Sequence, residues 1–208
     1  LALSLACCII LMRYIHRELT VDTHCVDREN VYAVIREEEG HMDFVFDDEL
    51  GNDEYLVETH AKLVLLEQEY LTYNQKLYPA DIIVGDHNFF KLFSYNVIQG
   101  TDLQNTPNAA VLTKDYAHKL FGDENPIGKI LYDSSGNEIA VAGVIENSDN
   151  KCSFTFDMVL AQSRKAGTPI NLLRFRPETD MERMNDLFGE TRYSYSDHNP
   201  HPYTYHLI

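Results

Sequence analysis

The chain has 208 residues, of which 44% are hydrophobic, so it is long enough for one domain or two small ones with a sizeable core. Its 17 basic and 33 acidic residues give a net charge of −16. A nucleic-acid-binding protein needs a basic surface to displace counterions from phosphate groups, so this charge excludes nucleic acid as a partner.

The chain opens with an apolar run, Leu1–Met12, that only Ser4 interrupts before Arg13. A membrane-spanning helix needs about 20 apolar residues. Because the chain has no initiator Met, we interpret the run as the second half of such a helix, followed by a stalk. A buried core helix is an alternative. A further alternative places Arg13 and Arg17 in the cytoplasm, as the positive-inside rule favours. A signal peptide is disfavoured, because its positive charge precedes the apolar run.

The four cysteines suggest no metal or redox motif. Cys7 and Cys8 lie in the apolar run, where they act as small apolar residues. Cys25 and Cys152 lack the CxxC spacing of zinc and thioredoxin-type sites. They form a disulfide if the domain is extracytoplasmic and the two lie close together, or they remain free thiols.

The first part of the chain predicts two strands, a helix and a hairpin. Val31–Ile35 is β-branched and aromatic, and Met42–Phe46 alternates apolar and polar residues, so both favour strands. Apolar residues at helical spacing predict a helix over 55–66. Two further strand-like runs, 66–72 and 77–84, flank a polar turn and predict a hairpin.

The remaining sequence alternates between helices and strands. Asp86 is a candidate N-cap for a short helix through Phe93, and Thr113 for a helix that ends at Gly122. The other predicted elements are strands at 96–100, 109–112, 129–132, 138–145, 154–160, 170–175 and 203–208, and a helix at 178–188.

Mixed strands and helices with hairpins and short crossovers indicate an α+β fold. The strands at 31–35, 154–160, 170–175 and 203–208 are expected to form one sheet built from both chain ends. The segment 86–149 is then an insertion with a small sheet of its own.

Residues 86–160 carry three motif segments in order. They read HNFFKLFSYNVIQGTDL, then AAVLTKDYAHKLFGDENPIGKILY, then EIAVAGVIEN followed by FTFDMVLA. These segments resemble the periplasmic core domain of MacB/FtsX-type ABC transporter permeases, especially the FtsX-like permeases of Bacteroidetes. The resemblance covers nearly the whole chain and is weakest in 36–75 and 162–202. The family often has a proline after the segment that ends at Ile145, and this chain has none there.

The resemblance implies a fold and its boundaries. Residues 1–28 are expected to be the end of a transmembrane helix and a stalk. Residues 29–85 and 150–208 are expected to form a porter-like mixed sheet with helices. Residues 86–149 are expected to form a small sabre-like, β-rich subdomain inserted into it.

The resemblance also implies a function. The domain is expected in the periplasm, on a permease of the bacterial inner membrane that forms a homodimer and pairs with a separate cytoplasmic ATPase subunit. Such permeases couple ATP-driven motion to export or periplasmic work by mechanotransmission, and residues 14–19 are in position to carry it. The alternative is a membrane-anchored extracytoplasmic sensory or ligand-binding domain.

The motif residues have structural roles in this interpretation. Aromatic side chains fix a short helix on a sheet, glycines take positive φ at the ends of elements, and a proline fixes φ in a turn. None of these residues is a reactive group. The residues are Phe89, Phe90, Phe93, Gly100, Phe121, Gly122, Asn125, Pro126, Ile127 and Gly128.

Three patterns resemble ligand sites but lack the required spacing. The segment 122–129 has five residues between its glycines and no Ser or Thr after its lysine, so it is not a phosphate-binding loop. His198, His201 and His206 lie among prolines, without a helical metal-binding spacing. The acidic residues in 43–54 lack the calcium-loop pattern. We therefore expect no metal, no cofactor and no enzymatic activity.

Overall fold

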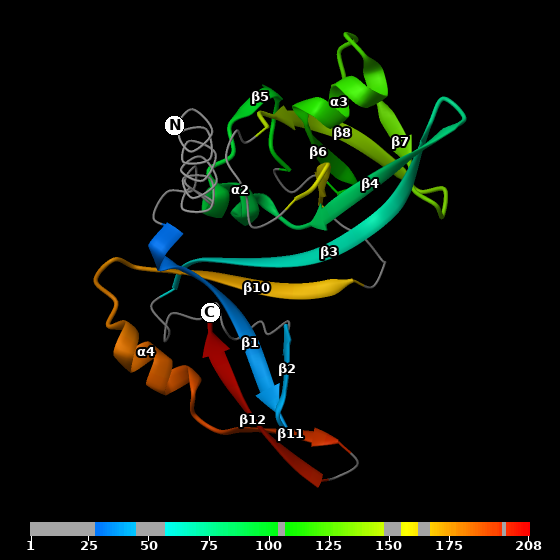
Figure 1. Ribbon diagram of the computed structural model, residues 1–208. Helices are drawn as coiled ribbons and strands as arrows, with labels where there is room; N and C mark the ends of the chain where they lie inside the picture. The colour runs from blue at the N-terminus through cyan, green and yellow to red at the C-terminus, as the bar shows by residue number, and fades with distance from the viewer. Residues whose placement is uncertain (1–27, 45–56, 104–106, 148–154, 162–166, 197–198) are drawn as a thin grey trace, which may run out of the picture.

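The computed structural model describes residues 28–44, 57–103, 107–147, 155–161, 167–196 and 199–208 (Figure 1). The predicted membrane helix and stalk, and both Cys25 and Cys152, lie outside these residues. Within the described ranges, no helix is both long and apolar enough to cross a membrane.

One mixed sheet of twelve strands organises the fold, in the order β11-β12-β1-β10-β3-β4-β9-β6-β8-β5. β2 pairs with β1, and β7 pairs with β3 and β8. The strands are β1 Val31–Glu38, β2 His41–Phe44, β3 Val57–Tyr73, β4 Lys76–Val84, β5 Val97–Gly100, β6 Ala109–Thr113, β7 Ile130–Tyr132, β8 Glu138–Ile145, β9 Met158–Leu160, β10 Thr168–Phe175, β11 Arg192–Ser196 and β12 Asn199–Leu207. The helices are α2 His87–Phe93, α3 Lys114–Phe121 and α4 Met181–Phe188, and a 3-10 turn spans Arg28–Asn30.

The mixed sheet with few helices confirms the predicted α+β class. The prediction of a separate sheet in 86–149 is wrong. β9 pairs with β4 on one side and with β6 on the other, through Met158 opposite both Ile82 and Leu112. The strands of 86–149 therefore continue the main sheet, and β9 lies among them instead of beside β1 and β10. The proposed domain division remains a prediction.

The short helices α2 and α3 cover opposite faces of the sheet. Side chains alternate along a strand, so Ala109 and Val111 of β6 face the α2 core while Ala110 and Leu112 face the α3 core. All five residues of β6 are buried for this reason. A third core, under α4, packs against β1, β3, β10 and β12 (Figure 1).

Each helix begins at a side-chain cap. Asp86 accepts a hydrogen bond from Asn88 N at 2.8 Å, and Thr113 accepts one from Tyr116 N at 3.3 Å. Asp180 accepts two from the first turn of α4, so that helix begins at Met181 and not at residue 178 as predicted.

The predicted helix over 55–66 is wrong, because the described residues of this segment lie in β3. β3 is 17 residues long and pairs along both edges, with β10 and with β4. Its two faces lie in different cores, with Leu63 in the α2 core and Leu66 in the α3 core. Because both faces of β3 pack into a core, its sequence lacks the alternation of apolar and polar residues that is typical of a half-exposed strand. Its apolar residues therefore resemble the spacing of a helix.

Strand β11 is not among the predicted elements, and Arg192 at its start joins it to α4. Its guanidinium donates to the carbonyl oxygens of Phe188 at 2.8 Å, Glu190 at 3.0 Å and Leu187 at 3.1 Å. It also lies 5.1 Å from the ring centroid of Tyr205. Cations at a helix C-terminus satisfy its unpaired carbonyl groups.

We expect Arg192→Ala to lower the free energy of unfolding by about 2 kcal/mol, because several charged hydrogen bonds and a cation–π contact are lost. Urea denaturation measures the change. Arg183→Ala, on the exposed face of α4, is the matched control and should change stability by less than about 0.5 kcal/mol. Equal effects of the two substitutions would contradict the capping role.

Candidate functional site

The aromatic residues of the first motif segment form a closed cluster under α2. Phe89 is fully buried, and its ring centroid lies 4.9 Å from that of Phe93, 5.5 Å from Tyr95 and 5.6 Å from Phe156. Phe90 lies edge-on to Phe89 at 5.4 Å. Tilted and edge-to-face contacts are the favoured geometry of aromatic pairs. The cluster fixes α2 on the sheet.

The second motif segment ends α3 and turns the chain. The N–H of Gly122 donates to His118 O at 2.8 Å, and Gly122 has φ of +62°, which favours glycine. Phe121, the last residue of α3, is buried with its ring edge-on to Tyr73 at 4.8 Å. The helix end is therefore held from two sides.

A side chain closes the turn that follows. Asn125 Oδ1 accepts a hydrogen bond from Ile127 N at 3.1 Å, the usual asparagine turn. Gly128, with φ of +80°, donates its N–H to Val141 O of β8 at 2.8 Å. Pro126 is buried within the turn. The four residues thus fasten the turn to the sheet.

Gly100 lies where the first motif segment packs closely against the turn of the second. It has the positive φ expected at this position, +70°. A Cβ atom there would lie 2.1 Å from Ala142 O and 2.8 Å from Ile127 Cδ1. The end of β5 therefore passes directly over β8 and against the turn that carries Ile127, and only glycine leaves room for this.

Lys129 is held by side chains of the protein itself, as expected of a structural lysine and not of a phosphate-binding one. Its Nζ donates to Tyr73 Oη at 3.1 Å and to Glu124 Oε2, and it lies 5.3 Å from the ring centroid of Phe121. The hydrogen bond with Glu124 is the main cause that raises the pKa of Lys129 and lowers the pKa of Glu124.

We expect the Glu124 carboxyl to titrate below its ordinary range, as followed by its side-chain carbon chemical shift. A lowered folded-state pKa means that the carboxylate stabilises the fold above its unfolded-state pKa, and that this contribution is lost as the pH falls through the folded-state value. In Lys129→Met the titration should return to the ordinary range. An unchanged midpoint in this variant would contradict the assignment of the cause.

Tyr116 is a buried phenol of α3 whose pKa is raised well above its usual range. Burial is the main cause, and the charges of Asp157 and Tyr78 add to it. Its hydroxyl has no hydrogen-bond partner within the part of the chain that the structure describes. Burial therefore favours the neutral phenol.

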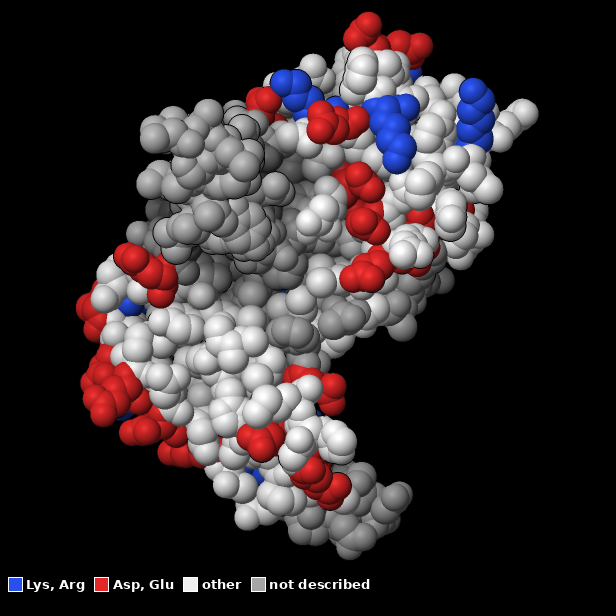
Figure 2. All heavy atoms as spheres, viewed as in Figure 1, with Lys and Arg blue, Asp and Glu red and all other residues white. Residues whose placement is uncertain are grey.

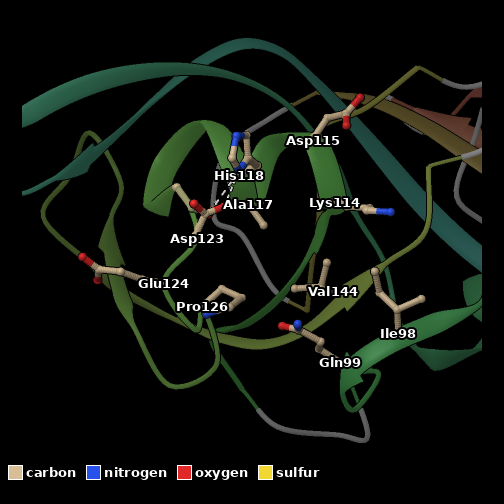
Figure 3. A pocket seen from close by; sticks show the side chains of 11 residues that line it. Ile98, Gln99, Lys114, Asp115, Ala117, His118, Asp123, Glu124, Pro126 and Val144 are labelled. Atoms are coloured by element: carbon tan, nitrogen blue, oxygen red, sulfur yellow. Dashed lines mark hydrogen bonds and ion pairs between the residues drawn. The ribbon is translucent and has the colours of Figure 1, made fainter.

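A groove of about 450 Å³ lies between α3, the motif turn and the β8–β5 edge of the sheet (Figure 3). Its apolar part is formed by Ile98, Ala117, Pro126 and Val144. Its polar rim is formed by Gln99, Lys114, Asp115, His118, Asp123 and Glu124. The elements that the motif fastens together are therefore the ones that form the groove. Because these residues come from three stretches of the chain, 98–99, 114–126 and 144, no single local pattern in the sequence indicates the groove.

Of the three patterns that resemble ligand sites, the segment 122–129 contributes to the groove, whereas His201 and His206 lie elsewhere. His206 lies 2.8 Å from Glu37 and His201 lies 3.6 Å from Glu39, both between β12 and the β1 segment. In the described ranges, no three His, Cys, Asp or Glu side chains are placed to hold a metal ion. His198 and most of the acidic run 43–54 lie outside the described residues.

Sequence comparison decides the family. The family model described as the MacB-like periplasmic core domain matches residues 1–189. The chain belongs to this family. It is thus the periplasmic domain of a MacB-like ABC transporter permease. No protein with a curated description matches the chain significantly.

Solved structures share the fold of this MacB-like domain. A domain of a permease protein from Porphyromonas gingivalis has a TM-score of 0.69 at 16% identity, covering 88% of this chain and 92% of that one. The periplasmic region of MacB from Actinobacillus actinomycetemcomitans has a TM-score of 0.63 at 13% identity, covering 88% and 90%. The extracellular domain of the noncanonic ABC-type transporter YknZ from Gram-positive bacteria has a TM-score of 0.56 at 14% identity, covering 86% and 100%.

Proposed function

We propose that this MacB-like domain transmits ATP-driven motion from the membrane to the periplasm, where the motion serves export or other work on substrates. Family membership over residues 1–189 is the observation that carries the proposal. The proposed role is mechanical and not catalytic, and it needs no cofactor. The proposed partners are a separate cytoplasmic ATPase subunit and a second copy of the permease in the inner membrane.

The pairing of β1 with β12 supports a mechanical role. The two strands are antiparallel neighbours, from Val34 opposite Leu207 to Glu38 opposite Tyr203. Ala33 and Ile208 exchange two further backbone hydrogen bonds of 2.9 Å each. A ladder of this kind resists sliding, so motion that enters through the segment before β1 also moves β12. In Figure 1 the C-terminus accordingly lies beside β1.

The experiment uses the full-length permease together with a candidate ATPase subunit, in lipid nanodiscs. Met42 is 60% exposed and suits a spin label after Met42→Cys substitution. We expect the label-to-label distance between the two copies to change when ATP replaces ADP. Labels at Met42 and Leu77 of one copy are the control and should keep their distance. If no ATPase subunit associates, or if the distance between copies stays constant, the proposal is wrong.

A further inference from the structure

We propose that the groove beside α3 binds a short extended segment of a partner protein, in which an apolar side chain is flanked by basic ones. The groove is the one formed by β5, β8, α3 and the motif turn. The inference goes beyond the transport role and holds for the domain by itself.

The groove offers an apolar surface at its base. Ile98 remains 36% exposed there although it is a large hydrophobic residue. Ala117, Pro126 and Val144 also line the groove toward α3 and the turn, although each is itself largely buried (Figure 3). An apolar side chain of a ligand loses its contact with water when it enters such a site, which favours binding.

The rim selects basic flanking groups. Lys114 is paired with Glu146 at 2.9 Å, and Glu124 is paired with Lys129. The carboxylates of Asp115 and Asp123 are the acidic groups that remain on the rim.

Among the described residues, neither of these two carboxylates has a Lys or Arg side chain within ion-pair distance. Asp115 accepts a hydrogen bond of 3.0 Å from the uncharged amide of Asn147. Asp123 is fully exposed, with His118 at 3.8 Å, near the limit of an ion pair. The rim is therefore complementary to Lys or Arg side chains.

The sheet edge supplies main-chain hydrogen bonds to an extended segment. β5 is the last strand in the sheet order, and in the described residues it pairs only with β8. Ile98 lies in a register shift between Val97 and Gln99, so its backbone is left out of that pairing. Strand addition at such an edge is a common way to bind an extended peptide.

The chain carries a net charge of −16, which attracts any basic peptide. The test therefore needs a control that separates this nonspecific attraction from binding in the groove. In Figure 2 acidic side chains line the edge where Figure 1 places α4, far from the groove. Asp186 is an exposed acid of α4. Asp186→Lys therefore changes the total charge as Asp123→Lys does, and leaves the groove intact.

The test measures fluorescence anisotropy of two labelled, end-capped peptides with the 208-residue chain. One peptide is Lys-Val-Lys-Val-Lys, and in the other serine replaces both valines. We expect the valine peptide to bind at least fivefold more tightly. Asp123→Lys should weaken its binding at least fivefold, and Asp186→Lys less than twofold. Asp123 is fully exposed, so its replacement should not disturb folding.

A second variant tests the apolar base. Ile98→Asn should reduce the difference between the valine and serine peptides and leave the binding of the serine peptide unchanged. Equal binding of the two peptides, equal effects of Asp123→Lys and Asp186→Lys, or no binding at all would each overturn the proposal. None of these outcomes bears on the motion of the full-length permease.

Discussion

Gly100→Ala is expected to lower the free energy of unfolding by about 3 kcal/mol. A left-handed backbone costs a residue with a side chain about 1–2 kcal/mol, and overpacking against a rigid neighbour adds about 1–3 kcal/mol. Both apply here, because φ is +70° and the new Cβ would lie 2.1 Å from Ala142 O, a backbone atom of β8 that cannot rotate away. Urea denaturation measures the loss.

Gly136→Ala is the matched control for this substitution. Gly136 has φ of +81° with no atom within 4 Å of an added Cβ, so only the backbone cost of about 1 kcal/mol applies. Equal losses for the two variants would show that the approach of β5 to β8 is not tight. A larger loss for Gly100→Ala would show that the crossing is essential to the fold of the motif region.

Phe89→Ala should cost about 4 kcal/mol, the largest loss that we expect from a single truncation in this domain. The side chain is fully buried and contacts four other aromatic rings. Those rings belong to α2, the segment after it and the approach to β9, so the cavity cannot close without moving several elements. Thermal and urea unfolding measure the change.

Two control variants separate the loss of packing around Phe89 from the mere removal of an aromatic side chain. Phe89→Leu keeps most of the apolar volume and should cost less than about 1.5 kcal/mol. Tyr193→Ala removes an aromatic side chain that is 56% exposed and should cost less than about 0.5 kcal/mol. A small effect of Phe89→Ala would mean that α2 is held by other contacts, and the role assigned to the aromatic motif would be wrong.

Local chemistry made much of the fold predictable. Asp86 and Thr113 cap the helices that their sequence positions indicate. The β3–β4 hairpin turns at Asn74 and Gln75, both with positive φ, as the polar break between two apolar runs predicts. These features depend on neighbours in sequence, and a linear pattern can record them.

Long-range pairing made the rest unpredictable. β3 and β9 owe their conformation and place to strands distant in sequence, and their own residues do not identify those partners. The same holds for the groove. The motif residues that support it were found, but Ile98, Asp115 and Asp123 are ordinary surface residues until the fold brings them together.

The order of strands also affects how the domain is made. β1 and β3 are synthesised early, yet β10, which hydrogen-bonds both of them, and β12, which pairs with β1, come near the end of the chain. During translation the apolar β3 is therefore present before β10, one of its two neighbouring strands, has been synthesised. Such non-local topologies fold slowly and expose strand edges that aggregate. We therefore expect chaperones to bind nascent chains that still lack β10 and β12.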